Sequence, residues 1–257
     1  MTSSHVLVHH SADLLAASVC ARLITALVDV QAAGRVPSWV LTGGTIADRV
    51  HRAVAAAPAR DAVDWSRVEL WWGDERFLPS GDPDRNDTQV RAALLDHVAL
   101  DSARVHPMPA AGDDHDPDRA AAMYASELAT RADREAGHGV PTFDVLMLGI
   151  GPDGHVASLF PGLPALHDGR PVAAVRDAPK PPPTRLTMTL STLARAREVW
   201  FVASGEEKAD AVERSMFAGH VDQVPAAGIR GLNRTLWLLD RDAAGQLPRP
   251  VDLAVNG

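Results

Sequence analysis

A glycine-rich segment at residues 149–162, GIGPDGHVASLFPG, holds the two side chains best suited to proton transfer. Asp153 lies two residues before His155, and glycines flank the pair. An aspartate this close to a histidine can orient it as a general base. Because a lone histidine is more often structural, the alternative is a loop histidine without a chemical role. The loop position favours catalysis by His155, with Asp153 as the orienting carboxylate.

A second polar segment, WGDERFLP at residues 72–79, follows a short apolar run. The guanidinium of Arg76 could hold a phosphate or a developing oxyanion, because its planar fork matches anionic oxygens. Asp74 could position a substrate hydroxyl or a partner side chain. The alternative is a solvated polar loop.

A third segment, LTGGT at residues 41–45, lies between an expected strand and an expected helix. Gly43 and Gly44 permit a tight turn and close backbone approach, and the following helix N-terminus offers free N–H groups. We therefore expect Gly43, Gly44 and Thr45 to bind a phosphate, the alternative being a purely structural turn. The pattern is neither G-x-G-x-x-G nor a Walker loop, so it predicts no nucleotide site.

The three segments can form one site only if the strands and helices around them bring them together. Short apolar runs alternate with longer helical patterns, which predicts an α/β fold with a mostly parallel, Rossmann-like sheet and helices on both faces. Ligands bind such sheets at the carboxyl ends of the strands, where all three segments fall. We predict a single domain over residues 1–257, with PKPPP (179–183) as a stiff loop.

The predicted strands cover residues 5–9, 39–41, 68–72, 143–148, 185–190, 199–203 and 236–239. The predicted helices cover residues 11–33, 47–57, 87–97, 118–136 and 206–217. Ser11 is the expected N-cap of the first helix, and Gly34 is expected to end it.

Composition excludes several other classes of function. The 257 residues carry a formal net charge of −8, which disfavours a nucleic-acid partner but not a small anionic substrate. Cys20 is the only cysteine, in an apolar helical context, so we expect it to be packed and inert. We expect no metal at His9-His10 and a solvated loop rather than a calcium site at residues 112–118. No apolar run is long enough for a membrane span, and no signal peptide is evident, so we expect a cytoplasmic protein.

The three segments, read in order, resemble the 6-phosphogluconolactonase family over nearly the whole chain. The most specific string is GxGxDGHxxSLFPG, and the other blocks are GDERFLP, Asn86 followed by Arg91, KPPPTRLTMT, GEEKA and LWLLDRDAA. The resemblance implies a fold shared with glucosamine-6-phosphate deaminase and ribose-5-phosphate isomerase. It also implies hydrolysis of 6-phosphogluconolactone to 6-phosphogluconate, without metal or cofactor.

The same resemblance implies roles for individual residues. His155 would activate water for attack on the lactone carbonyl, Asp153 would orient it or contact the sugar, and Arg76 matches the family's active-site arginine. Lys208 is a phosphate-binding candidate, and Lys180 and Arg185 are further candidates. In one departure from the family, the loop GGTIADR offers only the hydroxyl of Thr45, where many members have a serine or threonine pair and a proline.

Two alternative functions remain open at this point. An amino-sugar-phosphate isomerase or deaminase would share the fold, but this chain has SLFPG where those deaminases typically have a segment ending in Asn-Glu-Pro-Gly. Non-catalytic sugar-phosphate sensors often pair this fold with a DNA-binding helix-turn-helix, for which we expect no room before the first predicted strand at His5. The presence of both Asp153 and His155 also disfavours a sensor. We expect a sugar-phosphate lactone as the partner, no nucleic acid or membrane, and a monomer or weak homodimer.

Overall fold

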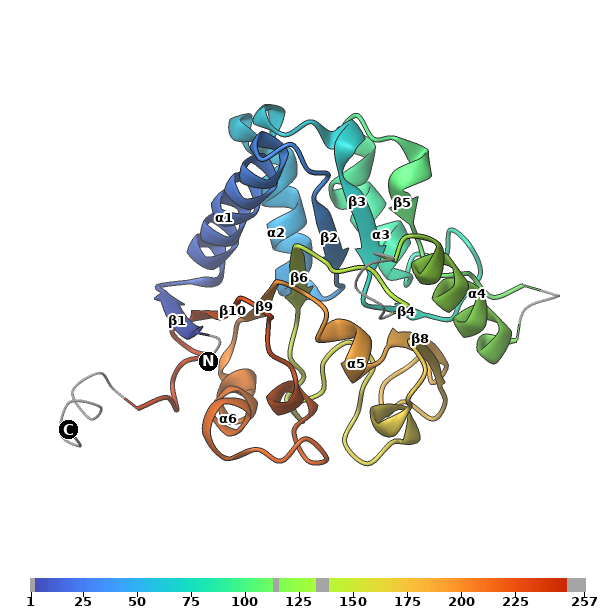
Figure 1. Cartoon of the computed structure of the whole chain (residues 1–257). Coiled ribbons are helices and arrows are strands. Elements are labelled where there is room, and N and C mark those ends of the chain that lie inside the picture. The colour runs from blue at the N-terminus through green and yellow to red at the C-terminus, as the bar shows by residue number, and fades with distance from the viewer. Residues whose placement is uncertain (1–2, 113–115, 133–138, 249–257) are drawn as a thin grey trace.

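The fold is built around a twisted parallel sheet, seen in a computed structural model that describes residues 3–112, 116–132 and 139–248 (Figure 1). The described residues form a seven-stranded sheet in which every neighbouring pair of strands is parallel. In spatial order its strands are β1 (Ser3–His9), β10 (Arg234–Asp240), β9 (Glu198–Ala203), β6 (Val145–Leu148), β2 (Ser38–Leu41), β3 (Glu69–Trp72) and β5 (Val105–His106).

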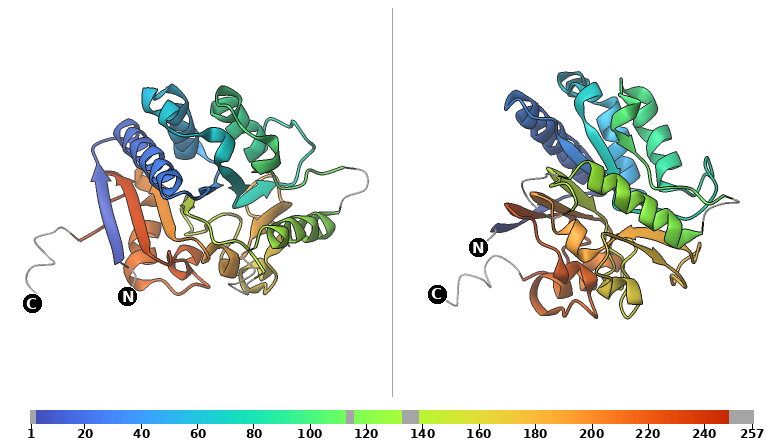
Figure 2. Two further views of the ribbon diagram at one scale, coloured as in Figure 1. Left: turned by 45° about the horizontal axis from the view of Figure 1, so that its top comes forward. Right: turned by 45° about the vertical axis from the view of Figure 1, so that its right-hand side comes forward.

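Helices cover both faces of this sheet, as the sequence predicts. Figures 1 and 2 show α1, α2 and α3 on one side, and α5, α6 and a small second sheet on the other. The helices are α1 (Ala12–Ala32), α2 (Thr45–Ala56), α3 (Asn86–Ala93), α4 (Pro117–Thr130), α5 (Leu190–Leu193) and α6 (Ala209–Glu213). None of the described helices is both long enough and apolar enough to cross a membrane.

The central strands are buried on both faces, which explains their continuous apolar runs. Every residue of β2 (SWVL) and β6 (VLML) is buried. Large aromatic side chains from neighbouring strands fill the core, and the rings of Phe201 and Trp237 stack with their centroids 4.1 Å apart. Cys20 is buried in α1, where burial raises the pKa of its thiol, in line with inert packing.

Most predicted elements are confirmed, and helix α1 shows why. Ser11 caps it by accepting a hydrogen bond from the N–H of Leu14 at 3.3 Å, and Gly34 follows it with φ +77°. A serine N-cap and a left-handed glycine beyond the C-terminus are the signals that mark a helix in the sequence. Both ends of the predicted helix 11–33 therefore agree with the structure to within a residue or two.

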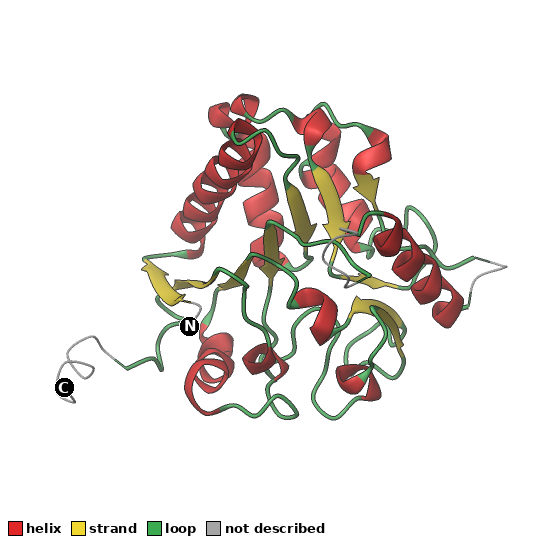
Figure 3. Cartoon of the chain, in the orientation of Figure 1, coloured by secondary structure: helices red, strands yellow, loops and turns green. Residues whose placement is uncertain are grey.

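The second sheet is where the sequence-based prediction is wrong. It consists of β4 (Asp74–Arg76), β8 (Arg185–Met188) and β7 (Val172–Val175), paired antiparallel (Figure 3). Residues 74–76 are thus a strand and not a loop, and the strand at 185 ends at Met188 and lies outside the parallel sheet. β4 has only three residues and pairs with a strand more than a hundred positions away, so no local periodicity marks it.

Several predicted helices are shorter than expected. The helix at 87–97 ends at Ala93 and is followed by a separate 3₁₀ turn, Leu95–His97. The helix at 118–136 ends at Thr130, and part of the remaining stretch falls outside the described residues, as do residues 113–115 of the acidic loop. The helix at 206–217 is divided into a 3₁₀ turn (Glu206–Lys208), α6 and a π-helical turn (Arg214–Ala218).

Candidate active site

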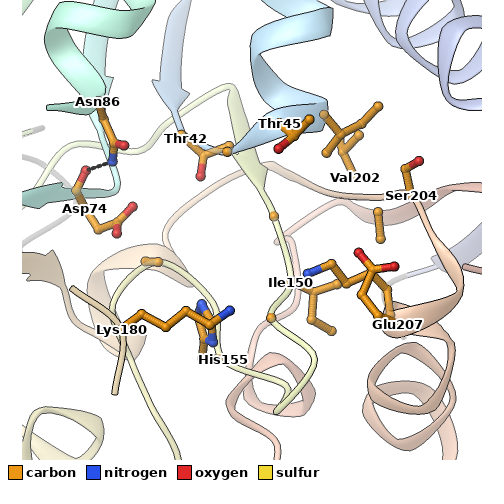
Figure 4. A pocket seen from close by; sticks show the side chains of 18 of the residues that line it. Thr42, Thr45, Asp74, Asn86, Ile150, His155, Lys180, Val202, Ser204 and Glu207 are labelled. Carbon is orange, nitrogen blue, oxygen red and sulfur yellow. Dashed lines mark hydrogen bonds between the residues drawn. The ribbon is translucent and has the colours of Figure 1, made fainter. Parts of the chain in front are cut away.

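A cavity of about 440 Å³ opens at the carboxyl ends of strands β2, β6 and β9, as expected for a parallel α/β sheet. Figure 4 shows Thr45, Asp74, His155 and Lys180 reaching into this space from different elements. Of the residues predicted from the sequence, all but Asp153 line it: Gly43, Gly44, Thr45, Asp74, Arg76, His155, Lys180, Arg185 and Lys208.

Asp153 lies behind His155 and contacts it directly. Its Oδ1 is 2.5 Å from Nδ1 of His155 and also accepts the backbone N–H of His155 at 3.3 Å. A carboxylate on Nδ1 favours the tautomer that leaves a free lone pair on Nε2. Burial acts to raise the pKa of Asp153, but the hydrogen bond and the charge of His155 outweigh it and hold that pKa below its ordinary value. A histidine held in this way by an ionised carboxylate is suited to general-base chemistry.

Glycines make this pairing sterically possible. A Cβ atom on Gly151 would collide with Nδ1 of His155 and Oδ1 of Asp153. Gly154, between the two residues, has φ +84°, a conformation that residues with a side chain rarely adopt. Its N–H donates to the carbonyl of Gly151 at 2.9 Å and closes the turn. Gly151 and Gly154 therefore permit the close contact of Asp153 with His155, and Gly151 also lines the cavity.

Strand β4 sends Asp74 and Arg76 to the cavity, because side chains two residues apart on a strand share a face. Oδ2 of Asp74 accepts a hydrogen bond from the hydroxyl of Ser158 at 2.7 Å. Nη1 of Arg76 donates to the carbonyl of Asp84 at 2.6 Å. The amide of Asn86 donates to the carbonyl of Asp74 at 3.0 Å, which ties β4 to the start of α3.

Glu75 points the other way, into the protein, and is fully buried. Its carboxylate accepts the backbone N–H groups of Arg76 and Asn86, each at 2.7 Å, and of Asp87 at 2.8 Å. The buried guanidinium of Arg85 lies 3.6 Å away. Burial raises the pKa of Glu75 to about 7, against the opposing effect of Arg85 and the three N–H groups. Glu75 thus clamps β4 to the N-terminus of α3 behind the cavity.

Two lysines supply positive charge to the cavity. The side chain of Lys208 makes no hydrogen bond or ion pair with any described residue, so its ammonium is available to a ligand. Burial lowers its pKa, with Glu207 acting against the shift and the nearby Lys180 adding to it. On the opposite wall, Gly44 (φ +101°) precedes α2, and no described side chain caps that helix. Its N-terminal N–H groups are therefore free to meet an anion.

Arg185 is placed differently from the two lysines. Its guanidinium donates to the carbonyls of Lys180 at 3.0 Å, Pro181 at 3.2 Å and Pro182 at 3.2 Å, and lies 5.8 Å from the ring centre of Phe160. Burial lowers the pKa of Arg185. These donors hold the proline loop that carries Lys180, and Arg185 also lines the cavity, so its predicted contact with a phosphate stays a prediction.

Comparison with known proteins places this geometry in a family. The model of the glucosamine-6-phosphate isomerases/6-phosphogluconolactonase family matches residues 10–237. The chain belongs to this family. A 6-phosphogluconolactonase of Streptomyces coelicolor is 53% identical over 247 residues, covering 95% of each chain. One of Mycobacterium tuberculosis is 45% identical over 247 residues, covering 96% of this chain and 99% of the relative.

Solved structures share the fold. A 6-phosphogluconolactonase from Trypanosoma brucei superposes with a TM-score of 0.81 at 26% identity, covering 96% of this chain and 100% of that one. A monomeric glucosamine-6-phosphate deaminase superposes with a TM-score of 0.76 at 20% identity, covering 95% and 99%, which shows the common fold.

Sequence reasoning missed the residues that hold the site from behind. Glu75 was visible in GDERFLP, but only its place on a strand shows that it faces away from Asp74 and Arg76. Asp240, at the end of β10, accepts the hydroxyl of Ser204 at 2.5 Å and the N–H of Gly205 at 3.2 Å, and so fixes the turn before Lys208. In the sequence, the only sign of this role is that Asp240 directly follows the last apolar run, LWLL at residues 236–239.

The described residues contain no group of three histidine, cysteine, aspartate or glutamate side chains arranged to hold a metal ion. His9, one of the paired histidines near the N-terminus, instead has its Nδ1 3.1 Å from the carbonyl of Leu239 at the sheet edge.

Proposed function

We propose that this chain hydrolyses 6-phospho-D-glucono-1,5-lactone to 6-phospho-D-gluconate, the lactonase step of the oxidative pentose phosphate pathway. Support for the substrate comes from curated relatives of that name at 53% and 45% identity over nearly their full length. The observation that carries the mechanism is the His155–Asp153 contact at the wall of a cavity that also holds unpaired ammonium groups.

In the proposed mechanism, Nε2 of His155 takes a proton from a water molecule as the water oxygen attacks the lactone carbonyl carbon. The resulting tetrahedral intermediate carries negative charge on the former carbonyl oxygen, and Arg76 is the candidate to stabilise it. The bond from this carbon to the ring oxygen then breaks, and His155 returns its proton to the leaving ring oxygen. General-base assistance of this kind is worth about 10²–10⁴-fold in rate.

The phosphate would be held at the opposite end of the substrate. The candidates are the free N–H groups at the start of α2, the hydroxyl of Thr45 and the ammonium groups of Lys208 and Lys180. A volume of about 440 Å³ falls within the usual range for small-molecule pockets. Asp74, anchored by Ser158, is positioned to accept a hydrogen bond from a sugar hydroxyl.

The proposed reaction uses no metal and no cofactor, because a lactone carbonyl is already activated toward water. The test is a hydrolysis assay on lactone generated in situ, with a metal chelator present and at slightly acidic pH, where the spontaneous reaction is slower. Glucosamine-6-phosphate serves as the comparison substrate for the deaminase alternative. Rapid lactone turnover in chelator, with none of the amino sugar, supports the proposal. Turnover of the amino sugar alone would contradict it.

A further inference from the structure

A second cavity, of about 480 Å³, lies at the end of the sheet opposite the candidate active site. One wall is the second half of α1, and the other contains the first residues of β6, β9 and β10. Among the described residues, the two cavities have no lining residue in common. A ligand bound here would therefore not contact His155 or the predicted phosphate-binding residues.

Arginines dominate the polar lining of this second cavity. Four reach it from separate parts of the chain, together with three carboxylates; the arginines are Arg22, Arg35, Arg197 and Arg234, and the carboxylates are Asp29, Asp144 and Glu198. Positive groups outnumber negative ones on this wall, although the chain as a whole carries a formal charge of −8. Local cationic character against an acidic background favours a negatively charged ligand.

Two of the carboxylates are already occupied. Asp144 has one oxygen 2.8 Å from Nη1 of Arg35 and 3.5 Å from Nε of Arg197, and its other oxygen accepts the N–H of Ser38 at 3.0 Å. Glu198 accepts from Nη2 of Arg234 at 2.8 Å on each oxygen. The single negative charge of Asp144 therefore neutralises only part of the combined positive charge of Arg35 and Arg197.

Arg22 has no partner of its own. Within the described part of the chain its side chain makes no hydrogen bond or ion pair, and its Nε is buried without an acceptor. The Nε atoms of Arg197 and Arg234 are also buried without a hydrogen bond. Asp29 is exposed and forms no ion pair with any of the four arginines. Unlike its Nε, the two terminal nitrogens of the Arg22 guanidinium are not enclosed by protein, and they have no described partner, so they are open to an anion in the cavity.

We propose that this cavity binds a small organic anion whose phosphate or carboxylate group is held by Arg22 and the neighbouring arginines. Guanidinium groups match the oxygens of both anions with paired hydrogen bonds. Ala26, Leu27 and Val30 of α1 form an apolar part of the wall that suits the carbon skeleton of such a ligand. The volume lies in the range of small-molecule sites.

Trp200 provides a local probe, because it lines the cavity and its indole N–H donates to Glu198 at 2.9 Å. The experiment titrates the ¹⁵N-labelled full chain with inorganic phosphate and, separately, with citrate, and follows the indole N–H signals. The Trp200 signal is assigned by its loss in Trp200→Phe. We expect it to shift saturably, and Arg22→Gln to weaken the apparent affinity by about tenfold or more.

Matched variants separate this cavity from the first. Arg52→Gln removes the same charge from an exposed arginine on α2 that pairs with Asp48, and it should bind the anions as the wild type does. Lys208→Ala weakens phosphate binding in the candidate active site, and the Trp200 shift should persist in it. A shift with only one anion supports the proposal and identifies the charged group. If neither anion moves the signal beyond a sodium chloride control of equal ionic strength, or if Arg22→Gln and Arg52→Gln bind equally, the proposal is wrong.

Discussion

At the scale of single residues, the account depends on Asp153 orienting His155. Asp153→Asn keeps the size of the side chain but removes its charge and allows its amide N–H to face the ring. We expect kcat to fall by at least about tenfold with little change in KM, because the loss affects proton transfer and not substrate binding. Steady-state kinetics measure this, with Asp118→Asn as a control, since Asp118 pairs with Arg176 on the exposed surface. Equal kcat values in the two variants would contradict the orienting role.

Gly151 gives a steric test at the same scale. Gly151→Ala puts a methyl group where the His155–Asp153 contact lies, so the two side chains must move apart. A displacement of about 1 Å in a catalytic group can cost about a hundredfold in rate, and we expect a loss in kcat/KM of that order. Gly169→Ala is the matched control, because a Cβ there meets no other atom within 4 Å. Near-normal activity of Gly151→Ala would show that the contact tolerates displacement.

At the scale of elements, Glu75 joins β4 to α3 and so determines where Arg76 lies. Glu75→Gln leaves the buried Arg85 without its counter-charge and replaces an acceptor by a donor facing backbone N–H groups. Removing one partner of a buried ion pair costs about 3–5 kcal/mol, and we expect a loss of that size in the free energy of unfolding at a pH above 7, where Glu75, with its pKa of about 7, is ionised. Urea denaturation measures it, with Asp96→Asn as the exposed control. A loss under about 1 kcal/mol would show that the clamp contributes little.

The same elements show what the sequence could reveal. The parallel strands and α1 were predictable because their apolar runs, N-cap and glycine stop are local signals. The second sheet was not predictable, because β4 is three residues long and gains its partners only in the folded chain.

For the candidate site, the residues that line the cavity were predictable from motifs. Those behind it, Glu75 and Asp240, depend on which way a side chain faces, which no motif records.

At the scale of the whole molecule, a charged cluster holds the edge of the large sheet. The two ring nitrogens of His106, on edge strand β5, lie 2.6 Å from Glu69 of β3 and 2.6 Å from Glu127 of α4, while Arg104 and Arg131 also contact Glu69. The ring of His106 stacks on Trp71 with centroids 3.9 Å apart. Burial acts to raise the pKa of Glu69, but His106 and the arginines outweigh it and lower that pKa below its ordinary value of 4.5.

This cluster predicts how stability depends on pH. A carboxyl whose pKa is lowered by folding stabilises the protein above its ordinary pKa of 4.5, and the contribution disappears as the pH falls through the lower value of the folded state. We therefore expect wild type to be more stable than Glu69→Gln at neutral pH, with the difference shrinking as the pH falls below 4.5. Urea denaturation across this range measures it. A difference that stays constant with pH would contradict the predicted ionisation of Glu69.

The central claim, that His155 is the base of a metal-independent lactone hydrolysis, is tested most directly by the kcat of His155→Ala in the presence of a chelator. The account predicts rapid turnover by wild type under these conditions. It predicts a kcat at least about a hundredfold lower in His155→Ala, with little change in KM, because only the proton-transfer step has lost its base. A variant within about threefold of wild type would contradict the assignment of His155. Loss of wild-type turnover in chelator would contradict the metal-independent mechanism.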